Sequence, residues 1–109
     1  MSYSRQLADR VRHTLGKQRG LVEKRMFGGV VFLLRGNMLV GIWEQSLIAR
    51  LGPDAAAQAL QEPNVRAFDV TGRPMRGWVM IDPDGLDRDA DLAAWLARAQ
   101  EFVETLPGK

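Results

Sequence analysis

The chain has no cysteine and only one histidine, His13, among its 109 residues. Without cysteine it can form no disulfide, no thiolate nucleophile, no zinc finger and no iron–sulfur site. A Ser-His-Asp relay would have to use His13, which lies off the apolar positions of its predicted helix and is therefore expected to be solvated. We predict a protein that is not an enzyme and that holds no metal ion and no cofactor.

Long hydrophobic runs are missing as well. No stretch approaches the roughly 18 apolar residues that a membrane span requires, and the N-terminal residues include no apolar segment of signal-peptide length. We therefore expect a cytoplasmic protein that makes no membrane contact. Hydrophobic residues (46%) and charged residues (26%) occur in ordinary globular proportions, which predicts a single domain over residues 1–109.

The net charge of +2 conceals an uneven distribution of charge along the chain. Residues 1–50 carry nine Lys and Arg against three Asp and Glu, whereas residues 51–109 carry six against ten. No block of five or six like charges occurs, so we favour complementation between the two halves, within one fold or between two copies. The basic residues of the first segment do not share one helix face, and no aromatic residues alternate with them. Sequence-specific DNA binding by the domain alone is therefore not expected.

The spacing of apolar residues predicts the secondary structure. Three- and four-residue spacing predicts a first helix that contains Leu7 to Leu15 and is closed by Gly16 and Gly20. The same spacing predicts a last helix with the stripe Leu92, Trp95, Leu96, Ala99, Phe102, Val103 and Leu106; the aspartates Asp87, Asp89 and Asp91 lie at its start, and Pro107-Gly108 ends it. Apolar runs predict strands at residues 30–34, 38–43, 46–51 and 78–81, and a short Ala-rich helix starts at Pro53 and stops at Glu62. Residues 64–77 are rich in turn formers. We predict an α+β domain: a mostly antiparallel sheet, the N-terminal and C-terminal helices packed on it, and one short helix between strands.

The strands at residues 30–34 and 38–43 are apolar on both faces, which predicts that both faces of the sheet are covered. With Gly36-Asn37 as the two-residue turn, Phe32 pairs with Gly41, whose missing side chain leaves room for the ring. If both long helices lie on one face, the other face needs a partner, and a homodimer is the expected solution. Helices on opposite faces would instead satisfy a monomer.

Two motifs resemble ligand-binding sequences, and each has a simpler structural interpretation. The aspartates from Asp82 to Asp91 do not match a calcium loop, because position six would be Asp87 and position twelve Ala93. Turns and helix capping explain them better. Gly28-Gly29 precedes a strand and fits neither phosphate-binding glycine motif, so a bulge or a close backbone approach is the favoured role.

The segment from Arg73 to Trp78 is the most unusual one in the sequence. Arg73 and Arg76 lie between glycines and next to Trp78, where they could hold a phosphate or a carboxylate. The same arginines could instead fix the loop by pairing with one of three acidic residues, namely Glu62, Asp69 or Asp82. Arg73, Arg76 and Trp78 are the candidate binding residues.

These segments also carry a family resemblance. Residues 24–29 (Lys-Arg-Met-Phe-Gly-Gly), the apolar hairpin, residues 72–78 (Gly-Arg-Pro-Met-Arg-Gly-Trp) and the terminal amphipathic helix resemble the N-terminal domain of the TfoX/Sxy family. The resemblance implies an α+β domain without catalytic residues. Full-length members of that family regulate natural competence together with the cyclic AMP receptor protein, and they carry a second, helical domain.

We therefore expect a non-enzymatic domain that binds a macromolecule within transcription regulation, through a protein partner. Binding of a small anion or another small ligand by the loop from Arg73 to Trp78 is the alternative function.

Overall fold

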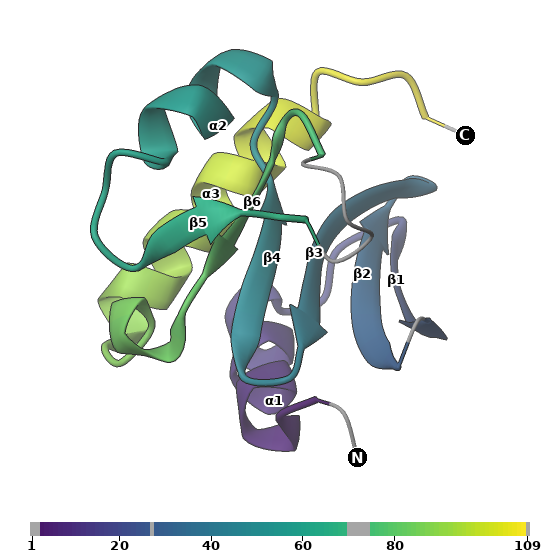
Figure 1. Cartoon of the computed structure of the whole chain (residues 1–109). Coiled ribbons are helices and arrows are strands. Elements are labelled where there is room, and N and C mark those ends of the chain that lie inside the picture. The colour runs from purple at the N-terminus through teal and green to yellow at the C-terminus, as the bar shows by residue number, and fades with distance from the viewer. Residues whose placement is uncertain (1–2, 27, 70–74, 109) are drawn as a thin grey trace.

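The structure is a computed structural model that describes residues 3–26, 28–69 and 75–108. Three α-helices, one short 3₁₀ helix and a six-stranded antiparallel sheet are formed by these residues, which confirms the predicted α+β fold (Figure 1). In chain order the elements are α1 (Arg5–Leu15), β1 (Leu21–Met26), β2 (Gly29–Leu34), β3 (Asn37–Trp43), β4 (Ser46–Arg50), α2 (Pro53–Ala59), β5 (Val65–Ala67), β6 (Trp78–Ile81), η1 (Pro83–Gly85) and α3 (Asp89–Val103).

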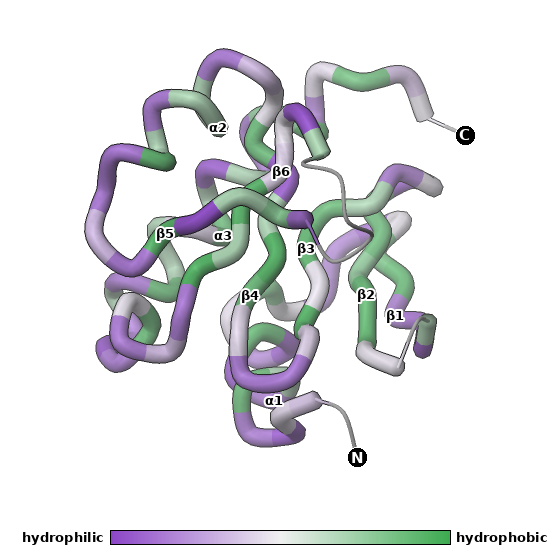
Figure 2. The backbone as a smooth tube through the Cα atoms, in the orientation of Figure 1, coloured by the Kyte–Doolittle hydropathy of each residue, from purple (hydrophilic) through white to green (hydrophobic). Residues whose placement is uncertain are grey.

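The sheet has the strand order β1-β2-β3-β4-β6-β5, and both long helices pack on the same face of it. In Figure 1 this face lies behind the sheet, where α3 contacts β3, β4 and α1. The main hydrophobic core fills the space between the sheet and the helices. Figure 2 shows the apolar residues concentrated in β2, β4 and β6. The helices therefore leave the opposite face of the sheet without a helical layer.

Both long helices follow the predicted pattern. The Ser4 hydroxyl accepts a hydrogen bond from the backbone N–H of Leu7 at 3.1 Å and caps α1, which ends at Gly16 in a left-handed conformation (φ 65°). Helix α3 begins with Asp89 and Asp91 in its first turn, where carboxylates favour the helix dipole. The two helices bury most of the stripes that the spacing predicted: Leu7, Ala8, Val11 and Leu15 on α1, and Leu92, Trp95, Leu96, Ala99 and Val103 on α3. The predicted stripe also included Phe102 and Leu106, but both are only half-buried, and α3 ends at Val103, before Leu106.

The predicted hairpin between β2 and β3 exists, but its predicted turn and register are wrong. The two turn residues are Arg35 and Gly36, with positive φ values of 52° and 84°, as a type I′ turn requires. A β-bulge near Phe32 then adds one residue to β3, so that Phe32 pairs with Val40 rather than Gly41. Gly41 faces Val31 instead, on the sheet face away from the helices.

The sequence prediction also missed the two strands at the edges of the sheet. Strand β1 is mostly exposed, and β5 is only three residues long, within the segment expected to consist of turns. Edge strands need not be apolar, because one side of their backbone and much of their side-chain surface face water. The predicted strand at residues 46–51 ends one residue earlier, at Arg50.

Candidate binding groove

An apolar groove of about 460 Å³ lies on the sheet face opposite α1 and α3. Of the residues that the structure describes, those that line it are all apolar or glycine. Its most distinctive members are three methionines and three aromatic residues, namely Met26, Met38, Met75, Trp43, Phe68 and Trp78. We call this site the sheet-face groove.

The floor of the sheet-face groove is a row of residues that are neighbours across three strands. Val31 on β2 pairs with Gly41 on β3, which pairs with Ile48 on β4. A Cβ atom at Gly41 would lie 3.3 Å from Cγ1 of Val31 and 4.0 Å from Cβ of Ile48. The glycine therefore leaves room between two buried apolar side chains in the floor of the groove.

One wall of the groove comes from the connection between β1 and β2. Met26 ends β1 and pairs with Gly29, the first residue of β2, and both line the groove. A Cβ atom at Gly29 would lie only 2.3 Å from the carbonyl oxygen of Ile42 on β3. Gly29 therefore permits the close backbone approach that the sequence favoured over a phosphate loop.

A tight turn from Met75 to Trp78 builds the opposite wall. The N–H of Trp78 donates to the carbonyl oxygen of Met75 at 3.2 Å, and Gly77 takes a positive φ of 91° in the turn. The Gly77 carbonyl in turn accepts hydrogen bonds from the N–H groups of Leu51 (2.9 Å) and Gly52 (3.1 Å). The turn is thus anchored to the end of β4, and it places Met75 and Trp78 at the groove.

Aromatic and cationic contacts hold Trp78 in this wall. Its ring lies 6.2 Å from the ring of Phe68 at an interplanar angle of 52°, a tilted aromatic pair. The guanidinium of Arg50 lies 5.4 Å from the centre of the indole ring, within cation–π range. Phe68 is also tied to the turn, because its carbonyl accepts the N–H of Met75 at 2.9 Å.

The three predicted binding residues have different outcomes. Trp78 lines the sheet-face groove, whereas Arg76 is exposed and forms no ion pair with any described residue. Arg73 lies outside the described residues. Two of the expected loop partners pair elsewhere: Asp82 with Arg66 at 2.9 Å, and Glu62 with Arg98 at 3.0 Å.

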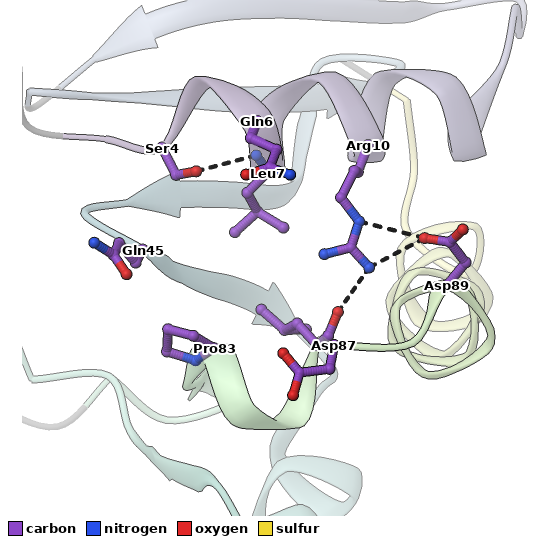
Figure 3. Close-up of a pocket in the computed structure, with 9 residues that line it drawn as sticks. Ser4, Gln6, Leu7, Arg10, Gln45, Pro83, Asp87 and Asp89 are labelled. Atoms are coloured by element: carbon purple, nitrogen blue, oxygen red, sulfur yellow. Dashed lines mark hydrogen bonds and ion pairs between the residues drawn. The ribbon is translucent and has the colours of Figure 1, made fainter.

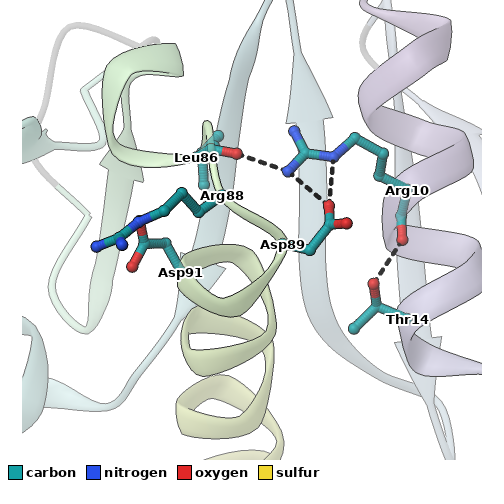
Figure 4. Close-up of polar contacts among 6 residues, drawn as sticks. All are labelled: Arg10, Thr14, Leu86, Arg88, Asp89 and Asp91. Carbon is teal, nitrogen blue, oxygen red and sulfur yellow. Dashed lines mark hydrogen bonds and ion pairs between the residues drawn. The ribbon is translucent and has the colours of Figure 1, made fainter.

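A second, polar pocket of about 350 Å³ lies between the start of α1 and the segment that leads into α3 (Figure 3). Arg10 reaches across it and donates to the carbonyl oxygen of Leu86 at 2.7 Å and to Oδ1 of Asp89 at 3.1 Å. Figure 4 shows the same contacts from another side, with Arg88 directed to Asp91. These contacts use Arg10, the one cationic residue among the described residues that line the pocket, to join two elements.

The aspartates near α3 occupy the turn and the first turn of the helix, as predicted, but the predicted capping is wrong: the N-cap residue of α3 is Arg88, and Asp82 at the start of η1 makes no side-chain cap hydrogen bond. Within residues 3–26, 28–69 and 75–108, no three His, Cys, Asp or Glu residues come together to hold a metal ion. Asp82 accepts hydrogen bonds from Arg66 and Ser46, and Asp91 from Arg88. None of the helices formed by the described residues has the length and hydrophobicity to cross a membrane.

One carboxyl group on the helix side of the sheet has a shifted pKa. Glu23 on β1 receives two hydrogen bonds from Arg12 on α1, Nε to Oε1 at 2.8 Å and Nη2 to Oε2 at 2.7 Å. These bonds lower the pKa of the Glu23 carboxyl below its ordinary value, although partial burial opposes the shift. The pair fixes α1 to the edge of the sheet.

The fold and the groove define an α+β domain with an apolar groove on the sheet face away from its two long helices. The TfoX N-terminal domain family matches the chain over residues 13–103, and the chain belongs to this family. No curated protein and no solved structure matches it. The matched range includes both walls of the sheet-face groove.

Sequence reasoning missed most of the groove. It identified Trp78, but not Met26, Met38 or Phe68, because these residues meet only after strands far apart in the sequence have paired. The signal that pointed to the groove was the hairpin with two apolar faces, since a single helical layer covers only one of them.

Proposed function

We propose that this chain is a non-enzymatic binding domain whose sheet-face groove receives a protein partner. The observation that supports the proposal is that the two motifs of the family resemblance meet there. Met26 and Gly29 from the first motif form one wall, and Met75 and Trp78 from the second form the other. These pairs are some 50 residues apart in the chain, so a purely local structural role does not explain why both serve one surface.

The chemistry of the groove suits a protein partner. Methionine side chains are flexible and polarizable, and they adapt to the shape of an apolar ligand. Tryptophan and arginine are enriched among the residues that dominate binding energy, and here Arg50 stacks on Trp78. A large apolar patch that a monomer leaves uncovered is typical of an interaction site.

We place this function in transcription regulation, and more narrowly in natural competence, because the family includes regulators of that process. The proposed domain acts in the cytoplasm through protein contact rather than by reading DNA sequence alone. A homodimer that used the exposed sheet face would cover the same groove, so self-association and partner binding would compete for one surface.

A small ligand is the second candidate, and the size of the groove supports it. A volume of about 460 Å³ falls in the range of small-molecule sites. We favour a largely apolar ligand, because no charged residue among those that the structure describes lines the groove. Arg73 lies outside the described residues, so the small anion expected from the arginines of the loop stays a separate proposal.

Capture of proteins from native extract by immobilised variants tests the main proposal. Met75 is 39% exposed and lines the groove, whereas Leu60 is 43% exposed and lies just after α2, away from the groove. We expect Met75→Glu to reduce capture of the specific partner at least tenfold and Leu60→Glu to leave it unchanged. Equal capture by parent and Met75→Glu, with both shown to be folded by circular dichroism, would refute a partner in the groove.

A further inference from the structure

The described residues of the sheet-face groove offer apolar contacts to a partner's side chains but no side-chain hydrogen bonds to its backbone. Its lining residues, as far as the structure describes the chain, are all apolar or glycine, and the strands that form its floor, β2, β3 and β4, pair with neighbours on both sides. An extended peptide in the groove would bury N–H and C=O groups without partners, which costs free energy for each group. An α-helix pairs these groups internally and presents only side chains. The groove therefore favours a helix over a strand.

The shape of the groove argues against a second copy of this chain as the occupant. The groove is concave, and two such grooves face to face would enclose empty space instead of close-packed atoms. The helices of a second copy cannot fill it either, because the apolar stripes of α1 and α3 are buried in their own core. The occupant must bring a convex apolar surface from another protein.

The charges beside the groove select the polar flanks of such a helix. Lys24 is exposed and pairs in register with Val31 of the floor. Its neighbour Glu23 bonds Arg12 on the helix side, so Lys24 lies on the groove side of β1. Arg76 is exposed beside Met75 at the other wall.

Arg50 adds a third positive charge at Trp78, and two exposed carboxylates adjoin the groove, Glu44 next to Trp43 and Asp69 next to Phe68. Among the described residues around the groove, these three cations outnumber the two carboxylates, so this part of its surroundings carries a net positive charge.

We propose that the sheet-face groove binds the apolar stripe of an amphipathic α-helix of a protein partner, and that acidic side chains beside this stripe meet Lys24 and Arg76. This inference rests on the proposed function and names the chemistry of the partner. Helices that dock in grooves insert side chains at i, i+3, i+4 and i+7, and a methionine-rich lining accepts such anchors without a strict demand on their identity.

Three synthetic peptides with the same leucine content provide the probes. The first carries a helical leucine stripe flanked by glutamates, and the second replaces the glutamates with lysines. The third has the composition of the first in strictly alternating order, which suits a strand. Binding is followed by isothermal calorimetry and by the fluorescence of Trp43 and Trp78, which line the groove.

We expect the glutamate-flanked helix to bind about tenfold more tightly than the lysine-flanked helix at low salt, and the difference to shrink as salt screens the rim charges. The alternating peptide should bind at least tenfold more weakly than the glutamate-flanked helix. Met75→Glu should weaken binding at least tenfold, and Leu60→Glu should not change it. The double variant Lys24→Glu plus Arg76→Glu should reverse the preference between the two helices.

Other outcomes overturn the inference and identify the true occupant. A preference for the lysine-flanked helix, or equal binding of the alternating peptide, refutes an acidic helix. Failure of all three peptides refutes it too. A dimer in light scattering would then assign the groove to a second copy, and saturable binding of a fluorescent fatty acid would assign it to a small apolar molecule. If the peptides fail while capture still depends on Met75, only this inference is wrong. If capture does not depend on Met75, the proposed function is wrong as well.

Discussion

Replacement of Gly29 by alanine tests how the close approach of β2 and β3 determines stability. The added Cβ would lie 2.3 Å from the carbonyl oxygen of Ile42, whereas a carbon and a carbonyl oxygen normally stay roughly 3.3–3.6 Å apart. The contact is with backbone, so the strands must separate by about 1 Å. Overpacking of this kind lowers the free energy of unfolding by about 1–3 kcal/mol and occasionally more, and we expect Gly29→Ala to lower it by about 3 kcal/mol.

Gly41→Ala is the matched control, because Gly41 lies on the neighbouring strand and also belongs to the groove. Its Cβ would lie 3.3 Å from the nearest atoms, one of them on the side chain of Val31, and alanine in a strand is favoured over glycine by roughly 0.5–1 kcal/mol. The two effects offset each other, so Gly41→Ala should stay within about 1 kcal/mol of the parent. Urea denaturation measures both changes. A loss below about 1 kcal/mol for Gly29→Ala, or a larger loss for Gly41→Ala, would refute the proposed strain.

Three further substitutions test other parts of the fold. Phe102→Ala removes a half-buried ring that lies against Gly52, where an added Cβ would be 2.6 Å from the ring. We expect the free energy of unfolding, measured by urea denaturation, to fall by about 3 kcal/mol. A decrease under about 1 kcal/mol would mean that α3 is not docked there. Arg10→Ala removes the hydrogen bonds and the ion pair that connect α1 to the start of α3, and it should lower the free energy of unfolding by about 2 kcal/mol. An unchanged thermal midpoint would contradict this expectation. Glu23→Gln removes a carboxylate whose pKa is lowered by Arg12. This carboxylate stabilises the fold above its unfolded pKa and loses that effect as pH falls through its lower folded pKa, so the parent's advantage over Glu23→Gln should be complete above about pH 5 and should shrink as pH falls below about 4.3, the ordinary pKa of glutamate. A constant advantage from pH 7 to pH 2 would contradict the ion pair.

The sequence predicts the central part of the fold well, because burial leaves a pattern in it. Strands β2, β3, β4 and β6 are mostly apolar, with polar residues only at strand ends, and α1 and α3 carry apolar stripes at helical spacing. The edge strands β1 and β5 leave no such pattern, since β1 is polar and exposed and β5 has only three residues. Edge pairing is decided by the backbone of the neighbouring strand, which composition does not reveal.

The error in the hairpin shows where local reasoning reaches its limit. Gly36-Asn37 and Arg35-Gly36 both place a glycine in a two-residue turn, and the choice between them changes every cross-strand pair. The bulge beside Phe32 then changes which face each residue of β3 occupies. Gly41 consequently lies in the groove and not in the core beneath Phe32.

Only part of the candidate site was predictable for a related reason. Trp78 stood out as an aromatic residue in a glycine-bounded loop, whereas Met26 and Met75 acquire a role only when β1 and β6 take their places in one sheet. Their contribution depends on contacts between distant segments, and no periodicity in the sequence encodes such contacts.

Site-specific photo-cross-linking measures most directly whether the partner occupies the sheet-face groove. A photoreactive phenylalanine analogue is placed at Met75, at Trp43 or, as a control outside the groove, at Leu60, and each variant is irradiated in living cells. Our account predicts one discrete protein adduct shared by the Met75 and Trp43 variants and absent from the Leu60 variant. Mass spectrometry should map this adduct to an amphipathic helix. An adduct at Leu60 alone, or no adduct at Met75 and Trp43 in folded protein, would contradict a partner in the groove.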